Sequence, residues 1–470
     1  MDKILDFLND IDTKILWGIW TLVFIAGVYL YFTIRSGFFQ VRSFGMIMKN
    51  TIGKMFEKGD KNNAGMTPFQ ATSTALASTV GMGSIAGVAV ALSVGGPGAI
   101  FWMWMLALFG MMTKAAEITL AVHYRDIDKD GNIHGGPMYY IKKGLGWKTL
   151  AKVFSAGIFI NAVFCASLLQ SHTVGRSFLE SYGISPYVVT AVMAIITAIV
   201  VIGGIKRIGK VCEKLVPLMS LVYVLAGLIV FIVNFSNIPE VFGQIFKYAF
   251  SPMPAIGGVA GTAVLKSIQI GMNKGMLGNE AGIGTAPMVH ATSNAKHPYQ
   301  QGMWGAFEVF FVTFVICTIT SFAVLSTGVL SGGESGVELV LQAFSSVFPK
   351  NIAEIIISFS ILTFCLSTQI GFFIYYETSV INVFGKGSMR YLKWFYFIPA
   401  IVFAGVADVD KLWTFANIAV VACAVPNLIG VLALRKGFFK LMNDYLSGAF
   451  KYSTKKTDET GDYVIIPKKK

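Results

Sequence analysis

Charged residues are scarce in this sequence: only 13% of its 470 residues are Asp, Glu, Lys or Arg, about half the share that is typical of soluble domains. Hydrophobic residues make up 54% of the chain, and no part is polar enough to form a soluble domain of any size. The composition therefore excludes a soluble globular protein and indicates a chain that lies largely in a lipid bilayer.

Patterns typical of enzymes and metal sites are also lacking. The five cysteines are far apart and form no C-x-x-C pair, which argues against a zinc site or a disulfide framework. Neither H-E-x-x-H nor G-x-S-x-G occurs, so we expect no enzyme and no cofactor. The net charge of +13 is spread over the connections between apolar segments rather than along one helix face, so we expect no nucleic-acid partner.

What the sequence does contain is a series of long apolar runs. A membrane-spanning helix needs about 20 apolar residues. About eleven suitable runs occur, near residues 14–34, 67–94, 98–122, 150–180, 185–204, 211–235, 253–290, 300–330, 352–384, 391–407 and 412–434. Every second connection is rich in Lys and Arg, which predicts an outside amino terminus and a cytoplasmic carboxyl terminus in the plasma (inner) membrane. The fold class is therefore an all-α polytopic membrane protein.

Glycines interrupt one of these runs, where residues 78–87 read S-T-V-G-M-G-S-I-A-G. One interpretation is a helix-packing face, because Gly83 and Gly87 form G-x-x-x-G. The other is a broken helix, as in secondary transporters, where free amides bind anionic groups and unwound carbonyls bind cations. A second glycine-rich tract, Met272 to Pro287, follows about 200 residues later and favours the broken helix.

Each glycine-rich tract opens a block of about five spans. Because five is odd, the second block enters the membrane from the opposite side, which predicts an inverted repeat with a binding site between the two breaks. The expected parts are a peripheral helix and basic loop (1–66), a first five-helix repeat (67–240), a second repeat (241–435) and a cytoplasmic tail (436–470).

Several motifs closely resemble those of the sodium:alanine symporters, the alanine or glycine:cation symporter family. They are the W-M-W block Gly95 to Gly110, G-G-P-M-Y-Y-I at Gly135 to Ile141, T-I-R-x-G-F-x-Q-x-R at Thr33 to Arg42, N-E-A-G-x-G at Asn279 to Gly284, H-P-x-x-Q-G at His297 to Gly302 and S-T-x-x-G at Ser367 to Gly371. The resemblance covers nearly the whole chain. It implies a leucine-transporter-like core of ten spans behind one additional helix, and alternating-access uptake of small neutral amino acids with sodium as the coupling ion.

The resemblance also implies a set of site residues. The substrate carboxylate is expected at the amides of Met82, Gly83 and Ser84, and its ammonium at carbonyls near Gly275, Met276 and Gly278. The other expected substrate-binding residues are Thr79, Gly81, Gln170, Asn279 and Phe372. The expected sodium ligands are the carbonyls of Ala77 and Val80 and the hydroxyls of Ser367 and Thr368.

Some residues depart from the family pattern. Met82 and Ser84 stand where the family has threonine and asparagine, and Phe372 replaces a tryptophan. A substrate larger than alanine therefore remains an alternative. The side chain of Gln369 is expected to lie inside the protein. His172 is a candidate for gating or proton coupling, beside its interpretation as a neutral histidine between helices.

Buried glutamates need partners inside a membrane. Glu280 is a candidate for gating, coupling or capping the second break, and Glu117 is expected to pair with Lys114.

The expected partners are a small amino acid, sodium and the lipid bilayer, and the sequence leaves the oligomeric state open. Alternative functions are a proton-coupled or larger-amino-acid transporter of the same fold. From broken helices and hydroxyl groups alone, a cation channel or an amino-acid sensor is a further alternative.

Overall fold

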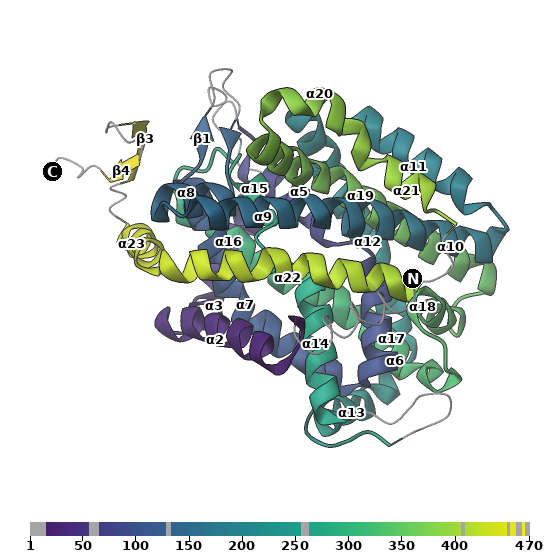
Figure 1. Ribbon diagram of the computed structural model, residues 1–470. Coiled ribbons are helices and arrows are strands. Elements are labelled where there is room, and N and C mark those ends of the chain that lie inside the picture. The colour runs from purple at the N-terminus through teal and green to yellow at the C-terminus, as the bar shows by residue number, and fades with distance from the viewer. Residues whose placement is uncertain are drawn as a thin grey trace.

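The computed structural model describes residues 16–55, 65–127, 133–254, 263–405, 409–448, 452–456 and 463–465. These residues are almost entirely helical (Figure 1). Short strands form two antiparallel pairs, β1 (Asp126–Ile127) with β2 (Ile133–His134) and β3 (Tyr452–Lys456) with β4 (Tyr463–Ile465). Residues 1–15 and 56–64 of the predicted peripheral part and residues 449–451, 457–462 and 466–470 of the predicted tail lie outside the described residues.

In the described ranges, six helical stretches are long and apolar enough to cross a bilayer. They are α7 (Gly98–His123), the run α9–η4–α10 (Lys148–Tyr182), α12 (Gly204–Val233), the run α16–η6–α17 (Pro298–Ser326), α19 (Lys350–Phe384) and the stretch Trp413–Ala433 of α22 (Val409–Ala433). The shorter apolar helices α2 (Ile19–Arg35) and α11 (Pro186–Val201) coincide with two further predicted spans. The predicted helical membrane class is therefore confirmed.

One predicted span is wrong as a continuous helix. Residues 391–407 contain three short pieces, α20 (Met389–Leu392), η9 (Lys393–Tyr396) and α21 (Ile398–Val402). Pro399 lies in the first turn of α21, where a proline starts a helix more easily than it continues one.

Several connections contain helices that were not among the predicted spans. They include α8 (Pro137–Leu145), α13 (Ile238–Phe250), at the bottom of Figure 1, and α18 (Gly336–Ser345). Helix α13 buries Ile238, Val241, Ile245 and Ala249, which is the one-sided pattern of a surface helix.

The first predicted break is confirmed. Helix α5 (Pro68–Thr79) begins with a capping box, in which Thr67 Oγ1 accepts the Gln70 amide while Gln70 Oε1 accepts the Thr67 amide. It ends at Val80, whose ψ of 85° is not helical. The chain resumes as η3 (Gly83–Gly87) and α6 (Val88–Gly95), and the two halves are bent by 56°.

The second break also lies within its predicted tract, Met272 to Pro287. Helix α14 (Val264–Asn279) ends where Glu280 adopts a left-handed conformation, with φ 54°. Gly282 and Gly284 also have positive φ before the short helix α15 (Ala286–His290) begins. The break therefore comes just after the carbonyl-bearing residues expected there, because Gly275, Met276 and Gly278 remain inside α14.

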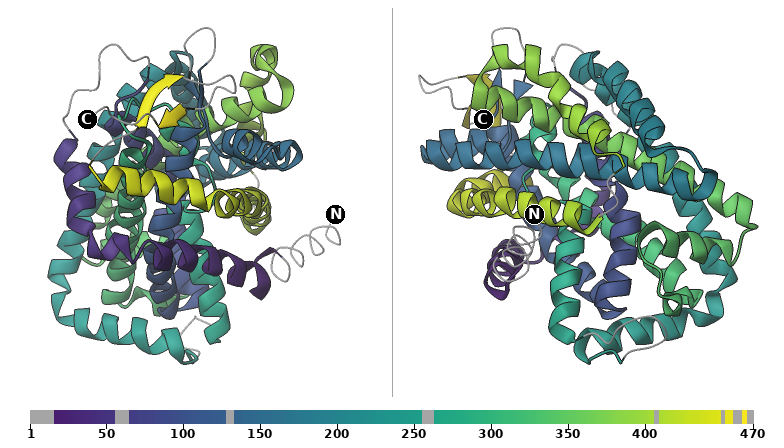
Figure 2. Two further views of the ribbon diagram at one scale, coloured as in Figure 1. Left: turned by 90° about the vertical axis from the view of Figure 1, so that its left-hand side faces the viewer. Right: turned by 45° about the vertical axis from the view of Figure 1, so that its right-hand side comes forward.

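Close backbone approach brings the breaks together. Helices α6 and α14 lie side by side in Figures 1 and 2. A Cβ on Gly83 would lie 3.6 Å from the Leu277 carbonyl oxygen, so the two broken helices meet at that point. A Cβ on Gly371 would lie 2.1 Å from Ser78 Oγ, so glycine is needed for α19 to pack this tightly on α5. Helix α2 lies at the edge of the bundle against α7, as expected for a peripheral helix.

Candidate functional site

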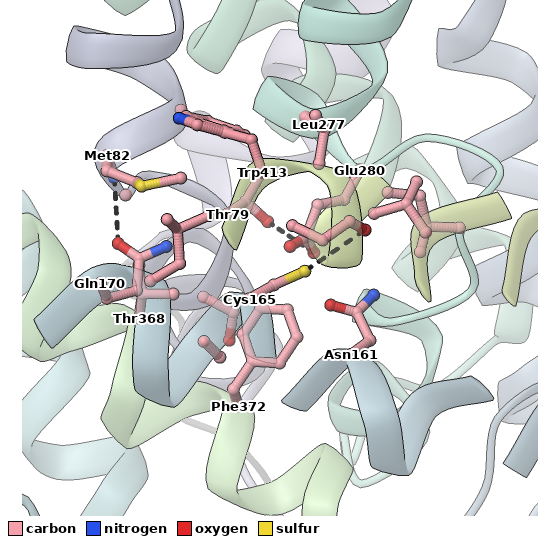
Figure 3. Close-up of a pocket in the computed structure, with 18 residues that line it drawn as sticks. Thr79, Met82, Asn161, Cys165, Gln170, Leu277, Glu280, Thr368, Phe372 and Trp413 are labelled. Carbon is pink, nitrogen blue, oxygen red and sulfur yellow. Dashed lines mark hydrogen bonds between the residues drawn. The ribbon is translucent and has the colours of Figure 1, made fainter. Parts of the chain in front are cut away.

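A cavity of about 40 Å³ lies between the two breaks. Its walls come from both broken helices, the run α9–η4–α10, α19 and α22. Figure 3 shows Gln170 and Met82 on one side, Glu280 on the other, and Trp413 and Phe372 above and below the space between them. This is the position predicted for the substrate site of an inverted-repeat transporter.

The structure divides the predicted substrate residues into two groups. Those that line the cavity are Thr79, Gly81, Met82, Gly83, Gln170 and Phe372. Those that do not are Ser84, Gly275, Met276, Gly278 and Asn279.

Residues of the second group make contacts outside the cavity. Ser84 donates its amide to the Gly81 carbonyl (3.1 Å) and accepts Thr320 Oγ1 at its own carbonyl (2.9 Å). Gly275 packs on α7, where an added Cβ would lie 3.3 Å from Met103 Cα. Asn279 accepts the Ala281 amide (3.0 Å), so its side chain supports the turn of the second break.

Neutral polar groups surround the first break. The Met82 amide donates to Gln170 Oε1 (3.1 Å), and Thr173 Oγ1 donates to Met82 Sδ (3.2 Å). A Cβ on Gly81 would lie 2.5 Å from Thr368 Oγ1 and 3.1 Å from Gln170 Oε1. Glycine is therefore needed at this position because α10 and α19 both close on the unwound backbone.

Three of the four predicted sodium ligands come together beside this break. The Ala77 carbonyl oxygen accepts Ser367 Oγ (3.1 Å) and Thr368 Oγ1 (3.2 Å), and all three residues are buried. Val80 is buried at the end of the same helix, and its amide donates to the Leu76 carbonyl (2.7 Å). Carbonyl and hydroxyl oxygens are the ligand type that a hard cation needs.

Charged groups surround the second break. Glu280 lines the cavity, and its Oε2 accepts Thr285 Oγ1 (2.6 Å) and Thr79 Oγ1 (3.4 Å). Glu117 accepts the Gly282 amide (3.1 Å) and the side-chain amide of Asn427. In the described ranges no ion pair joins Lys114 to Glu117, contrary to expectation, although the charge of Lys114 acts on Glu117. Lys114 Nζ donates to the Asn279 carbonyl (3.2 Å).

Two of the residues singled out in the sequence lie outside the cavity lining. His172 is buried in α10 but does not line the cavity. Gln369 is inside the protein as expected, yet it accepts Thr197 Oγ1 (3.2 Å) and donates to Ser171 Oγ (2.5 Å) and the Ser167 carbonyl (3.1 Å). Its side chain therefore holds α19 against α11 and against the run α9–η4–α10.

The lining residues that the sequence reasoning missed include Asn161, Cys165 and Trp413. The Trp413 ring also carries Lys274 Nζ at 3.6 Å from its centroid, within the range of a cation–π contact. The available signal was a lone tryptophan in the predicted span 412–434. Lys274, which its ring contacts, lies far away in the sequence.

Comparisons with known proteins identify the family of the chain. The chain matches the sodium:alanine symporter family over residues 1–459. The uncharacterized transporter YflA of Bacillus subtilis is 36% identical over 100% of this chain and 99% of its own length. The sodium/alanine symporter AgcS of Methanococcus maripaludis is 34% identical over 92% of this chain and 95% of its own length.

A solved structure shows the same fold at much lower identity. The manganese transporter of Eremococcus coleocola, in complex with an aromatic bis-isothiourea substituted compound, has a TM-score of 0.53 at 11% identity. The match covers 83% of this chain and 85% of that one, and it supports the leucine-transporter-like fold alone. Together with the residues matched above, these findings place the chain in the sodium:alanine symporter family, as a multi-pass membrane transporter that carries amino acids in symport with a cation and is not an enzyme.

Proposed function

We propose that the protein is a sodium-coupled symporter that imports small neutral amino acids of the alanine and glycine type by alternating access. One observation carries the proposal: Thr368 lines the cavity and also places its hydroxyl 3.2 Å from the Ala77 carbonyl oxygen. One side chain thus belongs both to the candidate substrate site and to the candidate sodium site. Occupation of either site therefore changes the surroundings of the other, which symport requires.

Sodium is favoured over protons by the chemistry of the candidate cation site. Ala77, Val80, Ser367 and Thr368 offer carbonyl and hydroxyl oxygens, none of which titrates near neutral pH. His172, the residue suspected of proton coupling, is not among the lining residues. A site of neutral oxygens can bind Na⁺ over the whole physiological pH range.

A small substrate is favoured by the size and shape of the cavity. Its volume is about 40 Å³, and the aromatic side chains of Phe372 and Trp413 line it. The relative AgcS is named a sodium/alanine symporter. On the carboxylate side we assign the Gly83 amide, at the start of η3, and the side-chain amide of Gln170.

Orientation in the membrane belongs to the same proposal. The basic connections place the carboxyl terminus in the cytoplasm and the amino terminus outside, in the plasma (inner) membrane. Import then runs from the outer face of the membrane, where α13 and α18 lie, toward the cytoplasmic face, where α5 begins.

Uptake into liposomes tests the proposal. Purified protein is reconstituted, sodium and proton gradients are imposed separately, and labelled alanine, glycine, glutamine and leucine are compared. We expect the sodium gradient alone to concentrate alanine and glycine. Accumulation that is independent of sodium would contradict symport with sodium, and a sodium current without amino acid would indicate a channel.

A further inference from the structure

One oxygen of the Glu280 carboxylate is left for a ligand. Glu280 is only 6% exposed and lines the cavity. Its Oε2 accepts the hydroxyls of Thr285 and Thr79, whereas its Oε1 has no hydrogen-bond partner among the residues that the structure describes. A buried carboxylate is costly unless both its charge and its hydrogen-bonding capacity are matched.

The backbone at this position shows that the side chain is needed. Glu280 has φ 54°, in the left-handed region where glycine is the usual residue after a helix. A non-glycine residue in that region is strained. Glycine would serve the turn better, so an interaction of the carboxylate has to compensate for the strain.

The nearby charge of Lys114 is shared by two carboxylates, Glu280 and Glu117. Lys114 donates to the Asn279 carbonyl and forms no ion pair with Glu280 or Glu117 within the described residues. Glu117 has both oxygens engaged, by Asn427 and by the Gly282 amide. Of these two carboxylates, the one with an oxygen left for a ligand is Glu280, which faces the cavity.

The rest of the cavity favours a cation at this end. Across the described residues, Glu280 is the sole acidic or basic side chain in the lining. Leu277, in the last turn of α14, also lines the cavity, so the negative end of the helix dipole points the same way. The opposite wall offers amide groups of Gly83 and Gln170, so the cavity is polarised along the line that joins the two breaks.

We propose that Glu280 binds the ammonium group of the transported amino acid, in place of the carbonyls of Gly275, Met276 and Gly278. The inference rests on the proposed function, since it names the group that recognises the amine. The ammonium pairs with Glu280 Oε1 while the carboxylate of the same molecule lies at Gly83 and Gln170. A 2-hydroxy acid lacks the positive charge and is rejected.

Equilibrium binding to the purified protein tests the inference apart from transport. Labelled alanine is bound in saturating sodium and displaced by unlabelled alanine or by 2-hydroxypropionate. Glu280→Gln keeps an oxygen for the two threonine hydroxyls but removes the charge, and we expect alanine affinity to fall at least about 30-fold. The preference for alanine over 2-hydroxypropionate should fall with it.

Two further variants serve as controls, one for misfolding and one for the chemical change itself. Glu280→Gly suits the left-handed backbone and should remain folded, with the same loss of alanine affinity. Glu240→Gln makes the same chemical change in the exposed part of α13, where Glu240 contacts Gln244 (3.0 Å), and should leave binding unchanged.

The outcomes separate the two proposals. Wild-type alanine affinity in both Glu280 variants overturns the ammonium site. So does an unchanged preference for alanine combined with lost sodium affinity, which makes Glu280 a sodium ligand. Normal binding by the wild type without sodium-driven accumulation contradicts the symport mechanism and leaves the ammonium site standing.

Discussion

The two helix breaks face the same cavity but are built from different chemistry. The first, between Thr79 and Gly83, is held by neutral groups, chiefly the Gln170 amide and the Thr368 hydroxyl. The second, after Asn279, is surrounded by Lys114, Glu117 and Glu280. The difference shows that one half of the inverted repeat relies on backbone dipoles, whereas the other adds full charges to the same kind of break.

The two breaks also differ in how they are anchored. The second is tied to three other helices: Tyr29 of α2 donates to the Ala281 carbonyl, Lys114 of α7 to the Asn279 carbonyl, and Asn427 of α22 to the Gly282 carbonyl (2.8 Å). The first is contacted by α10 and α19. We therefore expect a change of side-chain charge to have a larger effect at the second break than at the first.

The largest effect should come from adding a methyl group to the first break. In Gly81→Ala the new Cβ would lie 2.5 Å from Thr368 Oγ1, and a displacement of that kind lowers activity by about 100-fold. The measurement is the initial rate of sodium-driven alanine uptake. Gly87→Ala is the control, because its Cβ meets nothing closer than the Met82 carbonyl oxygen at 4.0 Å. Near-normal uptake by Gly81→Ala would refute the tight closure of α10 and α19.

An intermediate effect is expected at the candidate sodium site. Thr368→Val keeps the shape but removes the hydroxyl near the Ala77 carbonyl, so the half-saturating sodium concentration should rise by about 10-fold. Thr363→Val is a matched control on the same helix, since its hydroxyl donates only to the carbonyls of Phe359 (2.8 Å) and Ser360 (3.1 Å). Equal sodium dependence in the two variants would remove Thr368 from the cation site.

The smallest effect should come from Trp413, one of the two aromatic residues, with Phe372, that line the cavity. Trp413→Phe weakens the contact with Lys274 at 3.6 Å but keeps an aromatic ring on the cavity. We expect the KM for alanine to rise by about three- to tenfold. Trp394→Phe is the control, because that ring is 48% exposed and its Lys393 contact is 5.2 Å. A larger change in the Trp394 variant would show that Trp413 has no special role in the wall.

Much of the fold could be predicted because its signals are local. Apolar runs of sufficient length marked most spans, and glycine-rich tracts marked both breaks. The run at 391–407 failed because hydropathy does not show where a proline, here Pro399, restarts the helix.

Less of the site could be predicted, because it depends on which side of each helix faces the cavity. Gly275 and Met276 belong to the predicted tract, but they lie in a regular helix whose carbonyls are already engaged, as Met276 is by the Glu280 amide (2.8 Å). Glu280, a candidate for gating, coupling or capping the second break, lines the cavity. Its environment comes from α5, far from it in the chain.

The sequence by itself determined that the protein lies in a membrane, where its helices lie and where two of them must break, because hydropathy and glycine act on a residue and its near neighbours. The tertiary structure decided which carboxylate oxygen is left for a ligand. Thr79 lies 201 residues before Glu280, and Asn427 lies 310 residues after Glu117. Only packing across those separations engages both oxygens of Glu117 and leaves one oxygen of Glu280 facing the cavity.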